Sequence, residues 1–206
     1  AQGDWWGGAG GGTVAHASIA CFLGDTAETM MAFAATCEPD IPRIALVDFN
    51  NDSVKDSLLV MQRMFARYRE LIDSGDETEA KRYQLYAIRL DTSSSIRDVS
   101  VPPLGAPELD MGVNPRLVFI VRNAIDSAWC NWQLPRKWKD RAREWCESVK
   151  IVASGGFSPS KILRFEKLDV PVDIFAVGSS LFANDGPRVT DFTSDITQVK
   201  INGEWQ

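Results

Sequence analysis

The sequence is poor in the residues from which metal and redox centres are usually built. It has a single histidine, His16, and four cysteines, at positions 21, 37, 130 and 146, whose spacing fits no zinc motif. Cys21, Cys37 and Cys146 fall within apolar or amphipathic patterns, which predicts buried thiols in a reducing compartment. We therefore expect no metal site made of protein ligands alone.

Long apolar runs and an excess of positive charge are lacking too. No apolar run is long enough for a membrane span, and no basic segment followed by an apolar one marks a signal peptide, so we expect a cytoplasmic protein. The net charge of −6 argues against nucleic acid or an acidic membrane as a partner. An anionic substrate would need local anion sites, such as backbone N–H groups at a helix N-terminus.

The chain does contain short apolar runs that alternate with amphipathic segments. Strands are predicted at 43–49, 85–90, 150–153, 172–177 and, as a looser extended segment, 189–201, and helices at 14–23, 25–35, 53–72, 114–127, 136–148 and 159–168. The segment 73–82 is charged and predicted to be solvated, and 99–113 is predicted to be a loop. Repeated βα units of this kind predict a parallel sheet covered by helices.

Four of the predicted strands end in polar residues or glycines. Asp48 and Asp91 end the first two, Ser154-Gly155-Gly156 follows the third, and Gly178-Ser179 follows the fourth. In α/β barrels the chemistry collects at the carboxyl ends of the strands. We therefore expect these residues to converge on one pocket.

The two glycine turns suit a phosphate group. Glycine lets the backbone approach a ligand closely, and a following helix presents free N–H groups and a partial positive charge. Both Ser154-Gly155-Gly156 and Gly178-Ser179 have this form. The alternative is that they are simply tight connections between strand and helix.

Four charged or ionisable residues are candidates for contacts with a substrate or for catalysis. Asp48 and Asp91 end mostly apolar strands, where an unpaired carboxylate would be costly to bury. Arg89 lies two residues before Asp91 and so faces the same side, either as its ion-pair partner or as a substrate contact. His16 follows a glycine-rich stretch, and its residue environment alone allows a structural, an exposed or a catalytic role.

Several segments, taken in order, resemble those of nicotinate phosphoribosyltransferases. They are GTVAH (12–16), ALVDFNND (45–52), IRLDTSSS (88–95), NPRLVFIVRNAID (114–126), IVASGGFSPSKI (151–162), DIFAVGSSL (173–181) and DFTSDITQVKINGEW (191–205). Each piece is weakly specific, whereas the ordered set is strongly so, and the similarity runs from about Asp4 to the end of the chain.

The resemblance implies an α/β fold, a (β/α) barrel of the type II phosphoribosyltransferase kind. Residues 1–206 would form one domain, the C-terminal portion of that barrel. Members of the family carry an N-terminal domain and the first barrel units ahead of the segment GTVAH, and this sequence does not contain them. The resemblance also implies a homodimer, or an assembly with a chain that carries the missing portion.

The implied activity is the synthesis of nicotinate mononucleotide and pyrophosphate from nicotinate and phosphoribosyl pyrophosphate, in NAD biosynthesis. ATP hydrolysis would be coupled to it through a phosphorylated histidine, and Mg²⁺ would assist. By motif, the catalytic residues would be His16 and Asp91, and the substrate-binding residues would be Thr13, Asp48, Arg89, Ser154, Gly155, Gly156, Gly178 and Ser179.

One loop departs from the family pattern. Ser93 and Ile96 stand where relatives usually carry a proline and a second arginine, although Arg97 remains, so the anion contacts of this loop stay open. Two alternatives stay open: a quinolinate-type phosphoribosyltransferase, against which the segment GTVAH argues, and a non-catalytic fragment or subunit that needs a partner chain to complete the barrel.

Overall fold

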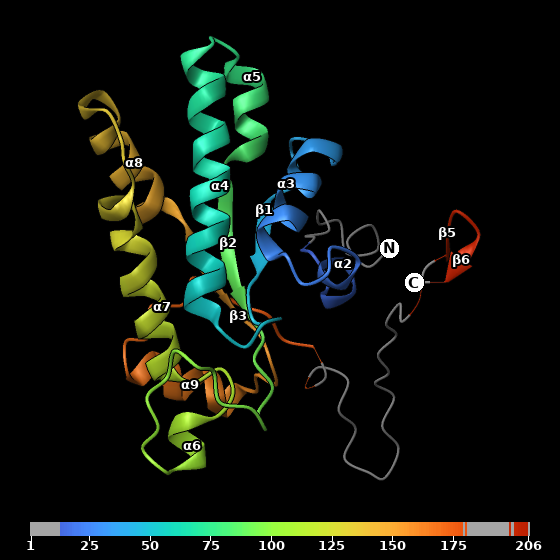
Figure 1. The fold of residues 1–206 in the computed structure, drawn as a ribbon. Helices are drawn as coiled ribbons and strands as arrows, with labels where there is room; N and C mark the ends of the chain where they lie inside the picture. Colours follow the sequence, from blue (N-terminus) through green and yellow to red (C-terminus); the bar gives the residue numbers. More distant parts are fainter. Residues whose placement is uncertain (1–12, 179, 181–197, 199, 206) are drawn as a thin grey trace, which may run out of the picture.

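A four-stranded parallel sheet forms the centre of the computed structural model, which describes residues 13–178, 180, 198 and 200–205 (Figure 1). Its strands, β1 (Arg43–Leu46), β2 (Leu85–Leu90), β3 (Lys150–Ala153) and β4 (Ile174–Phe175), are neighbours in chain order. The predicted α/β class with a parallel sheet is confirmed. Within the described strands β1 and β4 are edges, so closure into a barrel stays a prediction.

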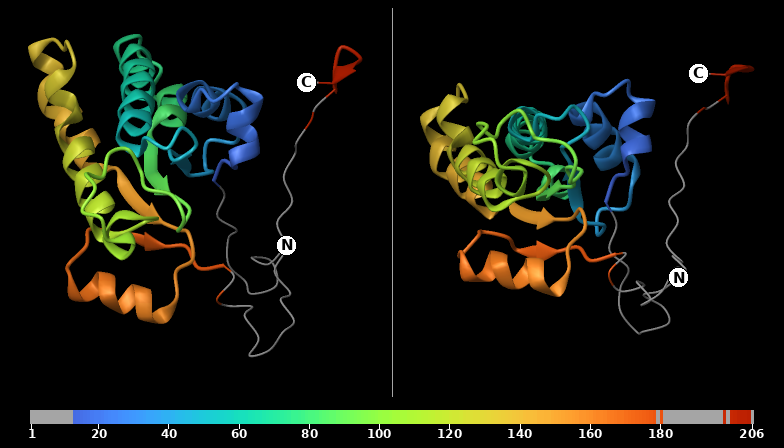
Figure 2. Two further views of the ribbon diagram at one scale, coloured as in Figure 1. Left: turned by 60° about the horizontal axis from the view of Figure 1, so that its bottom comes forward. Right: turned by 90° about the horizontal axis from the view of Figure 1, so that it is seen from below.

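The main helices lie side by side in an order that follows the sheet. They are α3 (Thr26–Thr36), α4 (Ser53–Asp73), α7 (Pro115–Ser127) and α8 (Arg136–Ser148), each in contact with the next, as Figure 1 shows. α2 (His16–Cys21) precedes them, and α9 (Pro159–Lys167) connects β3 to β4 (Figure 2). Helices between successive parallel strands are what repeated βα units require.

Helix α4 shows how the sequence specifies this layer. The Asp52 carboxylate accepts a hydrogen bond from the N–H of Lys55 at 3.1 Å and caps the helix start. Its apolar side, including Met61 and Phe65, is buried. The Phe65 ring stacks on Trp132 with centroids 4.8 Å apart and meets Trp145 edge-on at 5.4 Å, so an aromatic cluster ties α4 to α8.

Two predicted non-helical segments contain short helices instead. The segment 73–82 was expected to be solvated, but it forms α5 (Glu77–Ala80) followed by the 3₁₀ turn η1 (Lys81–Tyr83), and Ala80 and Tyr83 are buried. Within 99–113 lies α6 (Pro107–Asp110), and the 3₁₀ turn η2 (Ala128–Asn131) follows α7. Local capping, such as Asp76 accepting from the N–H of Glu79, offsets the high charge of the first segment.

A small antiparallel hairpin near the C-terminus was not predicted. β5 (Lys200–Ile201) pairs with β6 (Glu204–Trp205) across Asn202 and Gly203, both of which have positive φ. Two consecutive positive φ angles are the signature of a tight hairpin turn, for which Asn-Gly is the preferred pair. The remainder of the extended segment predicted at 189–201 lies largely outside the described residues.

The cysteine prediction holds only in part. Cys146 is buried as expected, whereas Cys21 is exposed and Cys37 is half-buried. Cys21 ends the short helix α2 on the side away from Ile19, which takes the buried position. Within the described ranges, no helix has the length and apolar character needed to cross a bilayer.

Candidate functional site

Side chains from three adjacent strands form two rows on one face of the sheet. Arg89 pairs in register with Val152, which pairs with Ile174. Because alternate residues of a strand face the same side, the residues two places further along belong to the same face. These are Asp91, Ser154 and Ala176, and all six residues line one cavity of about 590 Å³.

This cavity gathers most of the residues predicted from the sequence. The predicted site residues on its wall are Thr13, Arg89, Asp91, Ser154, Gly155, Gly156 and Gly178. The hydroxyl of Thr13 donates a 3.2 Å hydrogen bond to the carbonyl of Ile44, which holds the start of the described chain against β1. His16 and Asp48 are not among the lining residues, and Ser179 lies outside the described residues.

Arg89, Asp91 and Ser154 form a closed triangle of hydrogen bonds. Arg89 Nη2 lies 2.7 Å from Asp91 Oδ2, and Arg89 Nε donates to Ser154 Oγ at 3.1 Å. Ser154 Oγ lies 2.9 Å from Asp91 Oδ1 and 2.9 Å from the Leu90 carbonyl oxygen. Its single hydroxyl proton can be donated to either acceptor. The ion pair, one of the two alternatives left open for Arg89, is therefore present, and the Ser154 hydroxyl is occupied by protein groups rather than free for a phosphate.

His16 and Asp48 form a second pair beside this triangle. His16 Nε2 lies 3.1 Å from Asp48 Oδ2, and the exposed fractions of the two side chains are 42% and 8%. Leu46 pairs with Arg89, so two residues further on Asp48 comes beside Asp91. The pair therefore lies at the same carboxyl edge of the sheet as the cavity, next to its wall.

The environment of Asp48 raises the pKa of its carboxyl group. Burial raises the pKa of Asp48, the hydrogen bond with His16 opposes this rise, and the nearby charge of Asp91 adds to it. Asp48 Oδ1 is buried and forms no hydrogen bond with any described residue. A buried carboxylate oxygen without a partner is costly. This atom is therefore suited to accept a hydrogen bond from a ligand hydroxyl or to bind a cation.

The turn after β3 has the geometry of an anion site. Gly155 and Gly156 have φ of +86° and +69°, and a Cβ on Gly155 would come within 3.3 Å of the Thr92 carbonyl. In the described chain, the backbone N–H groups of residues 155–158 donate to no acceptor. Consecutive free N–H groups ahead of a helix form a concave site for a phosphate.

The second glycine turn lies against the first. Gly178 lines the cavity, and the hydroxyl of Ser180 donates to the Phe157 carbonyl at 2.9 Å. Phe157 is itself buried and packs on Phe165 and Phe175, whose ring centroids lie 5.0 and 5.3 Å away. The segment after β4 is therefore fixed to the turn after β3.

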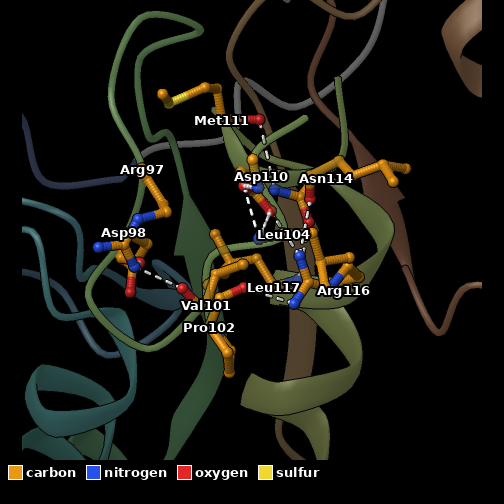
Figure 3. A network of polar contacts seen from close by, with 12 residues as sticks. Arg97, Asp98, Val101, Pro102, Leu104, Asp110, Met111, Asn114, Arg116 and Leu117 are labelled. Carbon is orange, nitrogen blue, oxygen red and sulfur yellow. Dashed lines mark hydrogen bonds and ion pairs between the residues drawn. The ribbon is translucent and has the colours of Figure 1, made fainter. Parts of the chain in front are cut away.

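The loop after β2 is held by its own polar network (Figure 3). Asp110 accepts from the N–H groups of Leu104 and Gly105 at 2.8 Å each, and from Arg116 Nη1 at 2.7 Å. Arg97, the arginine that remains in this loop, donates to the Asp98 and Val101 carbonyls. The sequence analysis did not single out Asp98 or Asp110. Acidic residues within a loop rich in proline and glycine often accept hydrogen bonds from the loop's own backbone.

Asp98 connects this loop to helix α4. Its carboxylate accepts from the N–H and the hydroxyl of Ser53, at 3.1 and 2.7 Å, and from the N–H of Ser100 at 2.8 Å. Asp98 has no exposed surface. The loop that begins next to Asp91 is thereby fixed to the first turn of the longest helix.

The site residues fit a magnesium ion only together with a substrate. No group of three or more His, Cys, Asp or Glu side chains among the described residues is placed to hold a metal. Mg²⁺ commonly binds one or two carboxylates, several waters and substrate phosphates. Asp48 and Asp91, with the unpartnered Asp48 Oδ1, can supply this small protein share.

No protein-family model and no curated protein matches the sequence. Among solved structures, the chain is similar to the crystal structure of nicotinate-nucleotide pyrophosphorylase from Pyrococcus furiosus, with 27% identity and a TM-score of 0.49. The similarity covers 87% of this chain and 33% of that one. The chain thus spans one third of the length of that solved structure, and its own residues must carry any assignment of activity.

Proposed function

We propose that this chain contributes the phosphoribosyl-binding half of an enzyme that joins nicotinate to the ribosyl group of phosphoribosyl pyrophosphate. The observation that carries the proposal is the turn at Gly155 and Gly156, whose free N–H groups border the same cavity as the Arg89–Asp91 pair. An anion site beside a carboxylate suits a sugar phosphate, because one group binds the phosphate and the other the hydroxyls.

The reaction passes through a ribosyl centre with oxocarbenium character, as pyrophosphate leaves and the nicotinate nitrogen attacks. Catalysis of this kind depends on positioning and on charge stabilisation. The turns at Gly155-Gly156 and Gly178 would hold the 5-phosphate, and Asp91 and Asp48 the ribose hydroxyls. Arg89 Nη1, which has no hydrogen bond among the described residues, would bind the nicotinate carboxylate.

Mg²⁺, when bound, would neutralise the charge of the leaving pyrophosphate. Asp91 and Asp48 are the residues of this chain that would hold it. Asp48 and Asp91 follow shortly after β1 and β2, whose last residues paired with each other are Leu46 and Arg89. Attachment to paired strand ends limits how far these two carboxylates can move before a substrate arrives.

His16 would couple ATP hydrolysis to this reaction. With its Nε2 proton donated to Asp48, the imidazole leaves the lone pair on Nδ1 free to attack the γ-phosphorus of ATP, and ADP departs. Water then cleaves the phosphohistidine and releases inorganic phosphate. The partly exposed ring is accessible for such a transfer.

The competent form would be a cytoplasmic homodimer or an assembly with a chain that carries the remaining barrel units. The cavity wall supports this, because Val152, Ile174 and Val177 present apolar side chains to an open space. Further protein over this face would exclude water from the reaction and supply contacts to the pyridine ring.

The test is a comparison of substrates for the chain alone and for the chain within its complete assembly. Formation of nicotinate mononucleotide from nicotinate and phosphoribosyl pyrophosphate, stimulated by ATP, would support the proposal. Decarboxylating turnover of quinolinate without ATP would favour the quinolinate-type alternative. Absence of both activities in every form would identify a non-catalytic subunit.

The His16→Ala variant provides a sharper prediction. We expect its turnover of nicotinate with ATP to fall to the level seen without ATP, because His16 is the single histidine of this sequence and the residue proposed to accept the phosphoryl group. Product formation with and without ATP, together with ADP release, measures this directly. ATP stimulation that persists in the variant would remove His16 from the proposal.

A further inference from the structure

Lys161 has an unusual environment for a lysine. It lies in the first turn of α9, where its Nζ donates a 3.1 Å hydrogen bond to the Gly155 carbonyl and sits 4.1 Å from the centroid of the Phe157 ring. The side chain is half-buried, and among the described residues no carboxylate pairs with it. Burial lowers the pKa of Lys161. A half-buried cation without a counter-ion is costly, which makes Lys161 a candidate for a role in binding.

The bond from Lys161 controls one peptide of the glycine turn. The peptide is trans, so its C=O and N–H groups point in opposite directions. Fixing the Gly155 carbonyl toward Lys161 therefore directs the N–H of Gly156 away from Lys161. That N–H is one of the four consecutive groups without an acceptor.

Gly155 packs closely against the Thr92 carbonyl, whereas the Gly156 side of this peptide has no such contact. A Cβ placed on Gly156 would meet no atom within 4 Å, so side-chain packing does not hold it. Two successive glycines lose a large amount of backbone freedom when they are ordered. Phe157, buried under Phe165 and Phe175, anchors the turn on one side, and Lys161 provides the polar contact on the other.

We propose that Lys161 is a positioning residue for the phosphate-binding turn: its ammonium group fixes the Gly155–Gly156 peptide and adds the positive charge that attracts a phosphate monoester. This inference rests on the proposed function, in which the turn holds the 5-phosphate of the ribosyl substrate. Sequence motifs gave no sign of it, because a lysine one turn into a helix is ordinarily a solvated surface residue.

The test uses the complete assembly with three variants and a matched control. Lys161→Met removes the charge and the hydrogen bond, Lys161→Gln keeps a donor without the charge, and Lys161→Arg keeps both. The control is Lys150→Met, a lysine that bonds to Tyr86 Oη at the opposite end of β3. Each variant is measured by steady-state kinetics and by calorimetric titration with inorganic phosphate.

We expect Lys161→Met and Lys161→Gln to raise KM for phosphoribosyl pyrophosphate by roughly 10- to 100-fold, as for loss of a charge-assisted hydrogen bond. KM for nicotinate and kcat would change little, and Lys161→Arg would recover most of the affinity. Lys150→Met would behave as the unmodified protein. If Lys161→Met folds poorly, the comparison of Lys161→Arg with Lys161→Gln decides the same question.

Two results would overturn the inference: Lys161→Gln binding phosphoribosyl pyrophosphate as well as Lys161→Arg does, or a rise in KM that is equal for both substrates. If the unmodified assembly shows no transfer to nicotinate, the proposed function fails. The affinity of the Lys161 variants for inorganic phosphate then tests the role of Lys161 independently of catalysis. Phosphate binding lost in Lys161→Gln and kept in Lys161→Arg would sustain it, whereas an absence of phosphate binding in the unmodified protein would refute it.

Discussion

The side chains of Arg89, Asp91 and Ser154 are hydrogen-bonded to one another before any ligand is bound. Each of the three contacts both others, and the two charged side chains are only 20% and 21% exposed. A group whose rotamer is fixed by its neighbours loses less entropy when a substrate binds. The triangle is therefore a preorganised wall of the cavity rather than a set of free side chains.

The sequence predicted that these residues would lie close together but not how they would bond to one another. Strand ends with polar residues pointed to Arg89, Asp91 and the turn at Gly155. The bonding of the Ser154 hydroxyl could not be predicted, because it depends on the register between β2 and β3. The same holds for Lys161, whose contact with Gly155 depends on where α9 begins.

The four thiols are predicted to differ sharply in reactivity. Burial raises the pKa of Cys146 to about 12, so this thiol stays protonated at pH 8 and is shielded as well, whereas Cys21 and Cys130 are exposed. Treatment of the native protein with iodoacetamide at pH 8 should label Cys21 and Cys130 and leave Cys146 unmodified, as measured by peptide mass spectrometry. Labelling of Cys146 as fast as Cys130 in folded protein would contradict the prediction, and denatured protein, labelled at all four, is the control.

At the scale of elements, the loop between β2 and α7 depends on its buried carboxylates. Asp98→Ala would leave the N–H groups of Ser53 and Ser100 without their acceptor at a fully buried position. We expect a loss of about 1–3 kcal/mol in the free energy of unfolding, the cost of buried donors left unsatisfied. Urea denaturation measures it.

The matched control for this change is Asp140→Ala, an exposed aspartate in α8 for which we expect a change within about 0.5 kcal/mol. Equal stability of the two variants would show that the Asp98 network contributes nothing to the fold. The kinetics of Asp98→Ala would also report whether the loop helps to hold Asp91.

Elements with a strong periodic pattern were predicted well, and short ones were not. The bounds of α4, α7, α8, β2 and β3 agree with the sequence to within a residue or two, because long amphipathic or apolar runs dominate local preferences. β4 has only two residues, although six were expected, since strand length depends on the neighbour that pairs with it. α5 and η1 bury only Ala80 and Tyr83, too weak a signal within a highly charged segment.

At the scale of the whole molecule, stability should be concentrated in the middle of the sheet. β2 and β3 each have hydrogen-bonded neighbours on both sides, whereas β4 is paired only with β3 among the described strands. We expect amide hydrogens of β2 and β3 to exchange with solvent most slowly, and those of β4 to exchange faster. Hydrogen–deuterium exchange with mass spectrometry checks this order, and equal protection of β4 and β2 would indicate a further strand beside β4.

The order of neighbours in the sheet is a property of the whole molecule that periodicity does not contain. The sequence predicted parallel strands from repeated βα units, and the observed order β1-β2-β3-β4 follows the chain without a reversal. A run of this kind is what a sector of a barrel requires, whereas an open doubly wound sheet reverses its order at a switch point. Pairing partners have to be seen in three dimensions before such a distinction can be made.

The register that aligns Arg89 with Val152 and Ile174 has a practical consequence for engineering. The groups proposed to bind the substrate follow the strand ends, and aromatic packing joins α4 to α8. Heat tolerance and substrate preference should therefore be adjustable in separate libraries, one randomising exposed helix positions and the other randomising the apolar wall residues. Gains from the two libraries should combine additively, because distant sites that share no contacts act independently.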